Sequence, residues 1–304
     1  MHNPKAGDRE HGKNQLMKAL AKAGHHATYQ STKKKGWKKA LKKKTDVVVA
    51  AGGDGTVAKV AAELVDTGIP LSVLPLGTAN NLARTLGFTH SIDEIIQRLE
   101  NGNNHAFDIG IARLPRTERY IFEGAGAGLL ADHVASADKM EKKKPRQTSR
   151  EQELARHVSL LRRMLHDYPA RKWKIEIDGK SIADRYILWE AMNIRSVGPA
   201  LYLAPWAATK DGEFDFVCVR EEDRELLMEH LDARLAGKKS KFPLPMRKFR
   251  KLKMTWEEAP VHLDDKLWPG KKDKPKKSAK IKITVKPSAL VIRRPHGGAK
   301  RQST

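Results

Sequence analysis

A glycine-rich segment, Gly52–Thr56 with the sequence GGDGT, contains the residue types that bind phosphate. It follows a continuous apolar run and precedes residues with helical spacing. Glycines let backbone N–H groups approach a phosphate closely, and a helix N-terminus adds a positive dipole end. A carboxylate there repels phosphate unless it holds Mg²⁺ or accepts a proton from an attacking hydroxyl. Asp54 therefore indicates phosphoryl transfer, and a tight turn with a capping Asp is the alternative interpretation.

A second segment of the same kind spans Leu74–Arg84, with the sequence LPLGTANNLAR. It also follows an apolar run and begins a predicted helix. Loops at the carboxyl ends of neighbouring parallel strands face one crevice, where open α/β sheets bind ligands. The two segments together therefore favour a nucleotide site over an isolated turn.

Two other glycine patterns do not indicate nucleotide binding. Gly7–Asn14 fits GxxxxGK but continues with Asn, whereas a P-loop uses a Ser or Thr hydroxyl there to bind Mg²⁺. Gly124–Gly128, with the sequence GAGAG, does not fit GxGxxG. We expect it to form a close-packed strand and turn that line an acceptor cleft.

The elements that must position the two loops alternate between strand and helix over the first hundred residues. Buried strands are predicted at 46–51 and 70–75, and a short strand at 26–30. Helices are predicted at 16–23, 37–42, 57–64, 80–86 and 92–99. The last begins with a capping box of Ser91 and Glu94. This order predicts a parallel sheet with right-handed crossovers.

After about residue 110 the pattern changes to short strands separated by turns. Strands are predicted at 120–123, 172–177, 186–193, 214–219, 251–256 and 281–285. One helix interrupts them, with its apolar stripe at Leu154, Val158, Leu161 and Leu165; His157 beside this stripe is predicted to be structural. The predicted fold class is an α/β nucleotide-binding domain with a parallel sheet plus an antiparallel β-sandwich domain.

The opening residues lack one expected element. A parallel α/β domain should begin with an apolar strand, yet the turn at Asn3–Gly7 follows Met1 almost at once. The hypothesis is that the true start lies upstream of Met1 or that the chain is trimmed.

The positive charge is confined to four runs. The 304 residues carry 59 Lys and Arg against 36 Asp and Glu, a net charge of +23. Runs 33–44, 142–150, 238–253 and 271–282 together carry +27, and the other 255 residues sum to −4. An anionic membrane surface or a nucleic acid backbone would attract such runs, and a solvated surface is the alternative. Because no nucleic-acid-binding motif accompanies them, no specific nucleic acid is expected.

Several classes of protein are excluded by composition. The single cysteine, Cys218, excludes an internal disulfide framework and a cysteine-based zinc site. No apolar run approaches the 18 or so residues of a membrane span, and the N-terminus lacks the apolar stretch of a secretory signal. We therefore expect a cytoplasmic protein.

At this point the chain resembles the diacylglycerol kinase catalytic-domain family, which includes bacterial lipid kinases and sphingosine kinases. That family shares its nucleotide-binding half with NAD kinases and phosphofructokinases. The two glycine loops in this order are its specific signature. Weaker matches are the turn at 3–7, the Ser31-Thr32 step, 108–110 (DIG), Ala204-Pro205, 211–215 (DGEFD) and 286–290 (KPSAL).

The resemblance implies an ATP-dependent lipid kinase with Mg²⁺ as cofactor. It implies an ATP-binding domain at 1–110, to which 288–304 returns, and a lipid-substrate sandwich at 111–287. The nucleotide site would comprise Asn3, Thr32, Gly52, Gly53, Asp54, Gly55, Thr56, Val57 and Thr78. Metal ligands would be Asp54, Asn81, Asp108 and, at a second structural site, Asp211. Asn81 is often Asp in relatives, but an amide oxygen can still coordinate Mg²⁺.

One departure from the family affects the catalytic residues. Relatives carry Asp-Gly-Glu where this chain has Asp264-Asp265-Lys266, and that acidic step is proposed to supply the general base. A lysine cannot act as a base unless its pKa is strongly lowered. Either Asp264 or Asp54 takes the proton, or Asp265 is repositioned to do so, or the enzyme is slow. The predicted catalytic residues are Asp54 and Asp264.

The sequence is compatible with two alternative functions and indicates the expected partners. A NAD kinase would share Gly52–Thr56, but the second loop and the absence of an Asn-Glu pair after Gly77 favour the lipid kinase. The other alternative is a basic membrane- or nucleic-acid-binding protein whose catalysis Lys266 impairs. The expected partner is a lipid substrate at an anionic membrane surface, reached through the four basic runs by peripheral association. A homodimer is left open.

Overall fold

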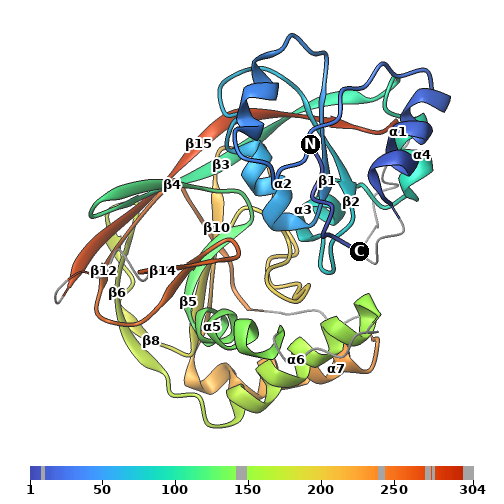
Figure 1. Cartoon of the computed structure of the whole chain (residues 1–304). Coiled ribbons are helices and arrows are strands. Elements are labelled where there is room, and N and C mark those ends of the chain that lie inside the picture. Colours follow the sequence, from blue (N-terminus) through green and yellow to red (C-terminus); the bar gives the residue numbers. More distant parts are fainter. Residues whose placement is uncertain (8–10, 142–148, 239–243, 271–274, 276–277, 297–304) are drawn as a thin grey trace. The chain divides into compact units, whose positions relative to one another are not determined.

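The structure is a computed structural model that describes all residues except 8–10, 142–148, 239–243, 271–274, 276–277 and 297–304. It divides into two compact units, which are described separately (Figure 1). Unit 1 comprises Met1–Phe107 and Ser288–Thr304, and unit 2 comprises Asp108–Pro287. The functional domains at 1–110 with 288–304 and at 111–287 remain a proposal.

Unit 1 contains a parallel sheet. Strand β1 (Val48–Gly52) pairs in parallel with β2 (Leu71–Pro75), which pairs in parallel with the end of β15 (Ala279–Arg294) through Ile292. Both β1 and β2 are almost wholly buried, as their apolar sequences predict. The predicted parallel α/β architecture is confirmed.

The residues before β1 occupy the position of the expected first strand. His2 forms parallel bridges to Ala51 on one side and Ser31 on the other. The His2 amide donates to the Gln30 carbonyl, and the Asn3 amide donates to the Ala51 carbonyl. Segment 26–30 lies outside the named strands, so the strand predicted there is wrong, since only one bridge forms beside it.

The helices of unit 1 follow the predicted order. They are α1 (Lys13–Lys22), the 3₁₀ helix η1 (Trp37–Lys42), α2 (Asp54–Ala61), α3 (Asn81–Thr85) and α4 (Ile92–Gln97). Helices α1 and α4 pack against each other (Figure 1). The predicted capping box opens α4, because the Ser91 hydroxyl accepts from the Glu94 amide while the Ser91 amide donates to the Glu94 carboxylate.

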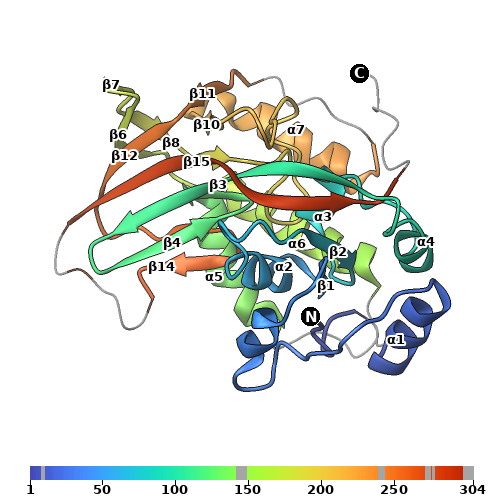
Figure 2. The ribbon, with the colours of Figure 1, turned by 90° about the horizontal axis from the view of Figure 1, so that it is seen from above.

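Unit 2 contains two antiparallel layers of strands. In the first layer, neighbouring strands follow the order β11 (Arg247–Phe249), β10 (Phe214–Val219), β9 (Leu188–Met192), β5 (Gly124–Gly128), β13 (Val261–Leu263) and β14 (Lys266–Trp268). In the second, β15 pairs with β12 (Lys251–Trp256), which pairs with β6 (Arg171–Ile177); β6 also pairs with β7 (Lys180–Ser181) and β8 (Asp184–Tyr186). Strands β3 (Asn103–Leu114) and β4 (Thr117–Ile121) form a hairpin (Figure 2). The predicted sandwich is confirmed.

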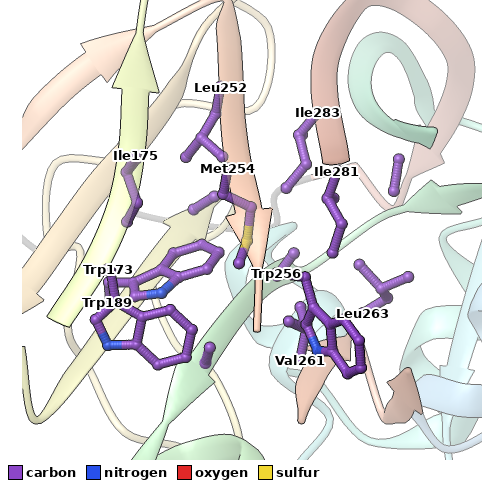
Figure 3. Packing of buried hydrophobic residues seen from close by; sticks show 14 of the residues in the cluster. Trp173, Ile175, Trp189, Leu252, Met254, Trp256, Val261, Leu263, Ile281 and Ile283 are labelled. Atoms are coloured by element: carbon purple, nitrogen blue, oxygen red, sulfur yellow. The ribbon is translucent and has the colours of Figure 1, made fainter. Parts of the chain in front are cut away.

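A continuous apolar core joins the two layers. Figure 3 shows Trp173 and Ile175 of β6 and Met254 of β12 close to Trp189 of β9. Alternate residues of each strand enter this core, as in the burial pattern of β12. The core fixes the strands that carry the polar residues described below.

The described residues of unit 2 form three α-helices, where the sequence predicted one. They are α5 (Leu129–Glu141), α6 (Arg150–His166) and α7 (Arg224–Leu235), the last preceded by the 3₁₀ helix η2 (Glu221–Asp223). The predicted stripe of α6 is buried and packs with β9, β10 and the other two helices. The sequence did not predict α7, because its many charged residues obscure the pattern of its short buried face. No described helix is long and apolar enough to cross a membrane.

Candidate functional site

The two glycine loops meet at one end of the parallel sheet in unit 1. Gly52 of β1 lies opposite Pro75 of β2, so both chains leave the sheet together. The Leu76 amide then donates to the Gly52 carbonyl at 3.0 Å. The first loop continues into α2 and the second into α3, as predicted from the residues that follow each loop.

Packing explains why glycines occupy these loops. A Cβ atom on Gly77 would lie 2.4 Å from the Cα atom of Gly53, and one on Gly52 would lie 2.6 Å from the Thr56 Cβ. Real Cβ atoms do not approach so closely, so neither glycine can be replaced without moving backbone. Gly53 and Gly55 remain partly exposed, so the backbone of the first loop is accessible to a ligand.

Asp54 connects the two loops. Its carboxylate accepts hydrogen bonds from the Asn81 amide at 3.1 Å and the Leu82 amide at 3.2 Å, which are the first residues of α3. Asp54 is itself the first residue of α2. The carboxylate is therefore held where two helices begin.

Asn80 closes the second loop and was not among the predicted residues. Its side-chain oxygen accepts from the Gly77 amide at 2.9 Å, and its amide nitrogen donates to the Gly77 carbonyl at 2.7 Å. Its φ of 50° is left-handed, a conformation that asparagine adopts more readily than most residues. The sequence signal was present, because asparagine is common in such turns.

The remaining predicted nucleotide residues of unit 1 lie around these loops. The Asn3 side-chain amide donates to the Thr56 hydroxyl at 3.2 Å, which ties the turn at 3–7 to the first loop. Val57 is buried and Thr78 is partly exposed. Thr32 is buried, and its hydroxyl donates to the His2 carbonyl. Its carbonyl accepts from the Lys59 ammonium at 2.7 Å, a contact that the sequence did not suggest.

The donor set at Asp54 fits a magnesium ion that is shared with a nucleotide. Mg²⁺ usually binds one or two carboxylates, keeps several waters and takes its other oxygens from substrate phosphates. Asp54 provides a carboxylate beside loops suited to phosphate, and Asn81 follows it at the start of α3. The described residues contain no group of three or more His, Cys, Asp or Glu side chains that could hold a metal alone.

Asp108 lies in unit 2 and organises a different segment. It is fully buried, and its carboxylate accepts from the Gly212 amide at 2.7 Å. Its carbonyl accepts from the Asn193 side chain at 2.8 Å, and the same amide group donates to the Phe122 carbonyl at 2.9 Å. Asp108 and Asn193 therefore hold the segments around 122 and 212 in place. The role of Asp108 as a metal ligand stays a prediction.

The environment of Asp211 does not fit a second metal ion. Its carboxylate contacts the Lys248 ammonium and accepts from the Glu213 amide. Asp215, buried on β10, lies opposite Lys248 of β11, and Glu213 pairs with Arg250 at 3.4 Å. Burial lowers the pKa of Lys248, but Asp211, Asp215 and Glu213 raise it more, so the ammonium stays charged. A lysine thus provides the positive charge that a structural cation would supply.

Asp264 occupies a tight turn between β13 and β14. Leu263 pairs with Lys266, so Asp264 and Asp265 form the two-residue turn, and the φ of Asp264 is 52°. The Asp264 carboxylate accepts from three consecutive amides, those of residues 122, 123 and 124, at 2.8–3.2 Å. Burial raises the pKa of Asp264 to about 6, although these amides lower it.

A buried ion pair supports this turn. The His262 Nε2 lies 2.9 Å from both carboxylate oxygens of Glu190, and its Nδ1 lies 3.1 Å from the Asp264 carbonyl. Both acceptors require a proton on the nitrogen that faces them, so His262 is an imidazolium. Burial lowers the pKa of His262, but Glu190 raises it further, and the net shift is upward.

Gly126 makes room for the ion pair. It lies on β5 between Glu190 of β9 and His262 of β13. A Cβ atom there would lie 2.2 Å from a Glu190 oxygen. The alternating glycines of β5 therefore have a packing role, as expected for a close-packed strand; a role in lining an acceptor cleft stays a prediction. Glu190 was missed, although a lone acid inside the apolar strand LWEAM was a signal.

The last two residues of the altered family motif face solvent. Asp265 and Lys266 are exposed, in contrast to the enclosed carboxylate of Asp264. The geometry therefore gives no sign that Asp265 takes the place of the missing glutamate, and Asp264 is the acid that the fold holds in a fixed position.

The basic runs differ in how their charges are used. The eight lysines of run 33–44 are all exposed around the buried Trp37, over whose ring the Lys59 ammonium lies at 4.8 Å. In run 238–253, Lys248, Arg250 and Lys253 pair with acids of unit 2. Residues 239–243 of run 238–253 lie outside the described residues, as does much of the other two runs, at 142–148, 271–274 and 276–277.

Comparison with known families matches both parts of the chain. Residues 1–112 match the diacylglycerol kinase catalytic domain, and residues 134–263 match the YegS C-terminal NAD kinase beta sandwich-like domain. The first match includes both glycine loops, and the second includes Glu190, Asp211 and His262.

Individual relatives are similar over most of their length. The chain is 30% identical over 234 residues to a diacylglycerol kinase of Bacillus subtilis (strain 168), which covers 73% of each protein. It is 27% identical over 253 residues to a diacylglycerol kinase of Staphylococcus aureus (strain MRSA252), covering 80% of this chain and 76% of the relative.

Solved structures share the fold. A crystal structure of a Bacillus anthracis str. Sterne protein covers 98% of this chain and 95% of its own, with a TM-score of 0.74 and 20% identity. Another, of a diacylglycerol kinase from the same organism, covers 98% and 96% with a TM-score of 0.69 and 18% identity. At these identities the likeness concerns the fold.

Proposed function

The chain belongs to the diacylglycerol kinase catalytic-domain family, and we propose that it transfers the γ-phosphoryl group of ATP to a hydroxyl of a membrane lipid such as diacylglycerol. The observation that carries this proposal is the Asp54 carboxylate, held by the first amides of α3 between two packed glycine loops. A carboxylate fixed beside accessible backbone amides suits a magnesium–phosphate group better than a bare phosphate.

The residues of unit 1 would bind the nucleotide. Backbone amides of the first loop and the N-terminus of α2 would cradle phosphate oxygens. Asp54, with Asn81 beside it, would hold Mg²⁺, which when bound neutralises charge that develops on the phosphates. Asn3 would keep the Thr56 hydroxyl oriented through the contact described above. Most of the rate enhancement would come from positioning and charge stabilisation.

We assign the proton transfer to Asp264. With a pKa of about 6 it is mostly ionised at pH 7, and its pKa lies close enough to neutrality to accept the proton of an attacking hydroxyl. Three backbone amides and the turn geometry fix its orientation. Lys266, exposed and at the position of the family's glutamate, has no part in this assignment.

The decisive experiment is transfer of radiolabelled phosphate from ATP to a panel of acceptors with and without Mg²⁺. The panel comprises diacylglycerol, a sphingoid base, ceramide and NAD. We expect Mg²⁺-dependent labelling of a lipid. Labelling of NAD alone would replace the proposal with a NAD kinase, and labelling of none would favour a binding protein without turnover.

We also propose that the exposed lysines of run 33–44 attract the protein to anionic lipid. Each Lys near such a surface contributes about 1 kcal/mol, and this attraction weakens as salt is added. Vesicle binding that is indifferent to both anionic lipid and ionic strength would contradict this part of the proposal.

A further inference from the structure

Part of the positive charge described in run 238–253 is paired within unit 2. Lys248, Arg250 and Lys253 of run 238–253 already pair with Asp211, Glu213 and Glu176. These acids reduce the net positive charge that the strands present to an anionic leaflet. Another exposed feature of unit 2 is suited to lipid in a different way.

One loop of unit 2 presents aromatic side chains to solvent. Trp206 is 71% exposed and Tyr202 is 41% exposed. The other five tryptophans of the chain are each no more than 6% exposed. Trp206 is thus the only tryptophan of the chain that the fold leaves outside its cores.

The loop itself is firmly anchored. Leu201, Leu203, Ala204 and Ala207 are buried and belong to the apolar cluster beneath α5, α6 and α7. The Ala204 amide donates to the Arg195 carbonyl at 3.1 Å, and the Ala207 amide donates to the Ala204 carbonyl at 3.0 Å. Since the neighbouring residues are fixed, the fold itself holds the Trp206 and Tyr202 rings outward.

The chemistry of this loop matches the interfacial zone of a lipid bilayer. Tryptophan and tyrosine combine a large apolar ring with one polar group, and they gather where lipid headgroups meet acyl chains. Arg195 and Lys210, which flank the aromatic residues in the sequence, are exposed and can approach phosphate headgroups. A partner with an apolar interior and an anionic surface complements both properties.

We propose that the loop 201–207 is a membrane anchor that inserts Trp206 and Tyr202 into the interfacial zone of a phospholipid bilayer. The choice of a bilayer as the partner rests on the proposed lipid kinase function. The anchoring does not require catalysis, because none of the residues that carry it is a predicted catalytic or nucleotide-binding residue. It would bring the protein to its acceptor in addition to the lysines of run 33–44.

Trp206 provides its own probe, because the other tryptophans are buried. Full-length protein is mixed with vesicles of phosphatidylcholine and phosphatidylglycerol, and tryptophan emission and quenching by brominated acyl chains are recorded without ATP. We expect a blue shift and strong quenching. Trp206→Ala should remove both and weaken vesicle binding about tenfold, which corresponds to about 1.4 kcal/mol. Trp206→Phe should retain part of the binding.

A matched control and two further measurements separate the explanations. Leu235→Ala removes another exposed apolar side chain, 37% exposed at the end of α7, and should leave vesicle binding unchanged. Quenching of Trp206 by ATP without vesicles would place it at the nucleotide and overturn the proposal. Protection from acrylamide that rises with protein concentration, without lipid, would assign the loop to a second copy of the chain and also overturn it.

The outcome is distinguishable from failure of the proposed function. If Trp206→Ala binds vesicles as the unaltered protein does, the anchor is refuted whatever the kinase assay gives. If vesicle binding depends on Trp206 while no lipid is phosphorylated, the anchor stands and the kinase proposal fails. Activity on dispersed short-chain diacylglycerol and the midpoint of urea unfolding should be unchanged in Trp206→Ala, and the midpoint shows that the variant is folded whatever the kinase assay gives.

Discussion

The turns at Asp54 and Asp264 use the same local device in different surroundings. Each carboxylate accepts consecutive backbone amides, two at Asp54 and three at Asp264. Asp54 lies at the start of two helices among partly exposed glycines, where a cation can approach. Asp264 lies against a buried ion pair, and burial raises its pKa to about 6. The comparison teaches that amide contacts fix a carboxylate, whereas its surroundings decide whether it suits a metal or a proton.

Asp54→Asn tests whether the Asp54 carboxylate binds a metal ion, and it has the largest expected effect of these variants. We expect phosphoryl transfer to fall at least about 10³-fold, because loss of a metal-binding carboxylate removes several kcal/mol of transition-state stabilisation. The free energy of unfolding should fall by only about 1 kcal/mol, the usual cost of a lost helix cap. Steady-state kinetics and urea unfolding measure the two effects.

The control is Asp46→Asn, which removes an exposed acid just before β1, at the other end of the strand from the loops. It should leave both activity and stability unchanged. Full activity in Asp54→Asn would refute the assignment of the site.

The pH dependence of kcat/KM tests whether Asp264 accepts the proton. A base with a pKa of about 6 is protonated below that pH, so kcat/KM should fall about tenfold per pH unit there. Asp264→Asn should lower kcat/KM about 10²–10⁴-fold, the usual contribution of general base catalysis, and remove the acidic limb. Persistence of that limb in the variant would assign the proton to another group.

Much of this comparison was predictable from the sequence, since both turns lie within motifs with strong local signals. The GGDGT loop and its flanking strand and helix form as predicted, because glycine, apolar runs and helical spacing act locally. The capping box at Ser91 and the buried stripe of α6 are also local features, and both are confirmed.

What the sequence could not supply are contacts between distant segments. Glu190 and His262 are 72 residues apart and meet only because β9, β5 and β13 pair in one register over Gly126. Lys248 was counted as part of a membrane-binding run, yet the pairing of β10 with β11 places it against Asp211 and Asp215. A run of charges in the sequence does not show which acids the fold will bring to it.

Glu190→Gln tests whether the buried ion pair of Glu190 and His262 is what makes the turn at Asp264 differ from the turn at Asp54. Removing one partner of a buried pair costs about 3–5 kcal/mol at acidic pH, where His262 stays protonated and would keep a charge without a counter-ion. The raised pKa of His262 gives a stabilisation that is full below about pH 6.5 and lost as pH rises through the raised value. In the variant, burial would lower that pKa, so stability should instead increase as pH rises through 6.5.

Urea unfolding from pH 5 to 9 measures this reversal. Glu257→Gln is the matched control, because Glu257 pairs with Lys174 at 2.6 Å while both side chains are more than half exposed. Exposed pairs contribute about 0–1 kcal/mol, so the control should differ little from the unaltered protein. An equal loss in both variants would show that the buried pair has no special part in the fold.

Lys266→Ala has the smallest expected effect and separates the family motif from the geometry of the turn. Lys266 is exposed, and the turn is held by the Asp264 carboxylate and the His262 contact on its other side. Both kcat/KM and the free energy of unfolding should change little, the latter by less than about 0.5 kcal/mol. Lys266→Glu restores the family's residue and tells whether the proton has a second route. If that variant gains activity and keeps it when Asp264 is replaced by Asn, the glutamate is the better base, and the enclosed Asp264 then serves to hold the turn.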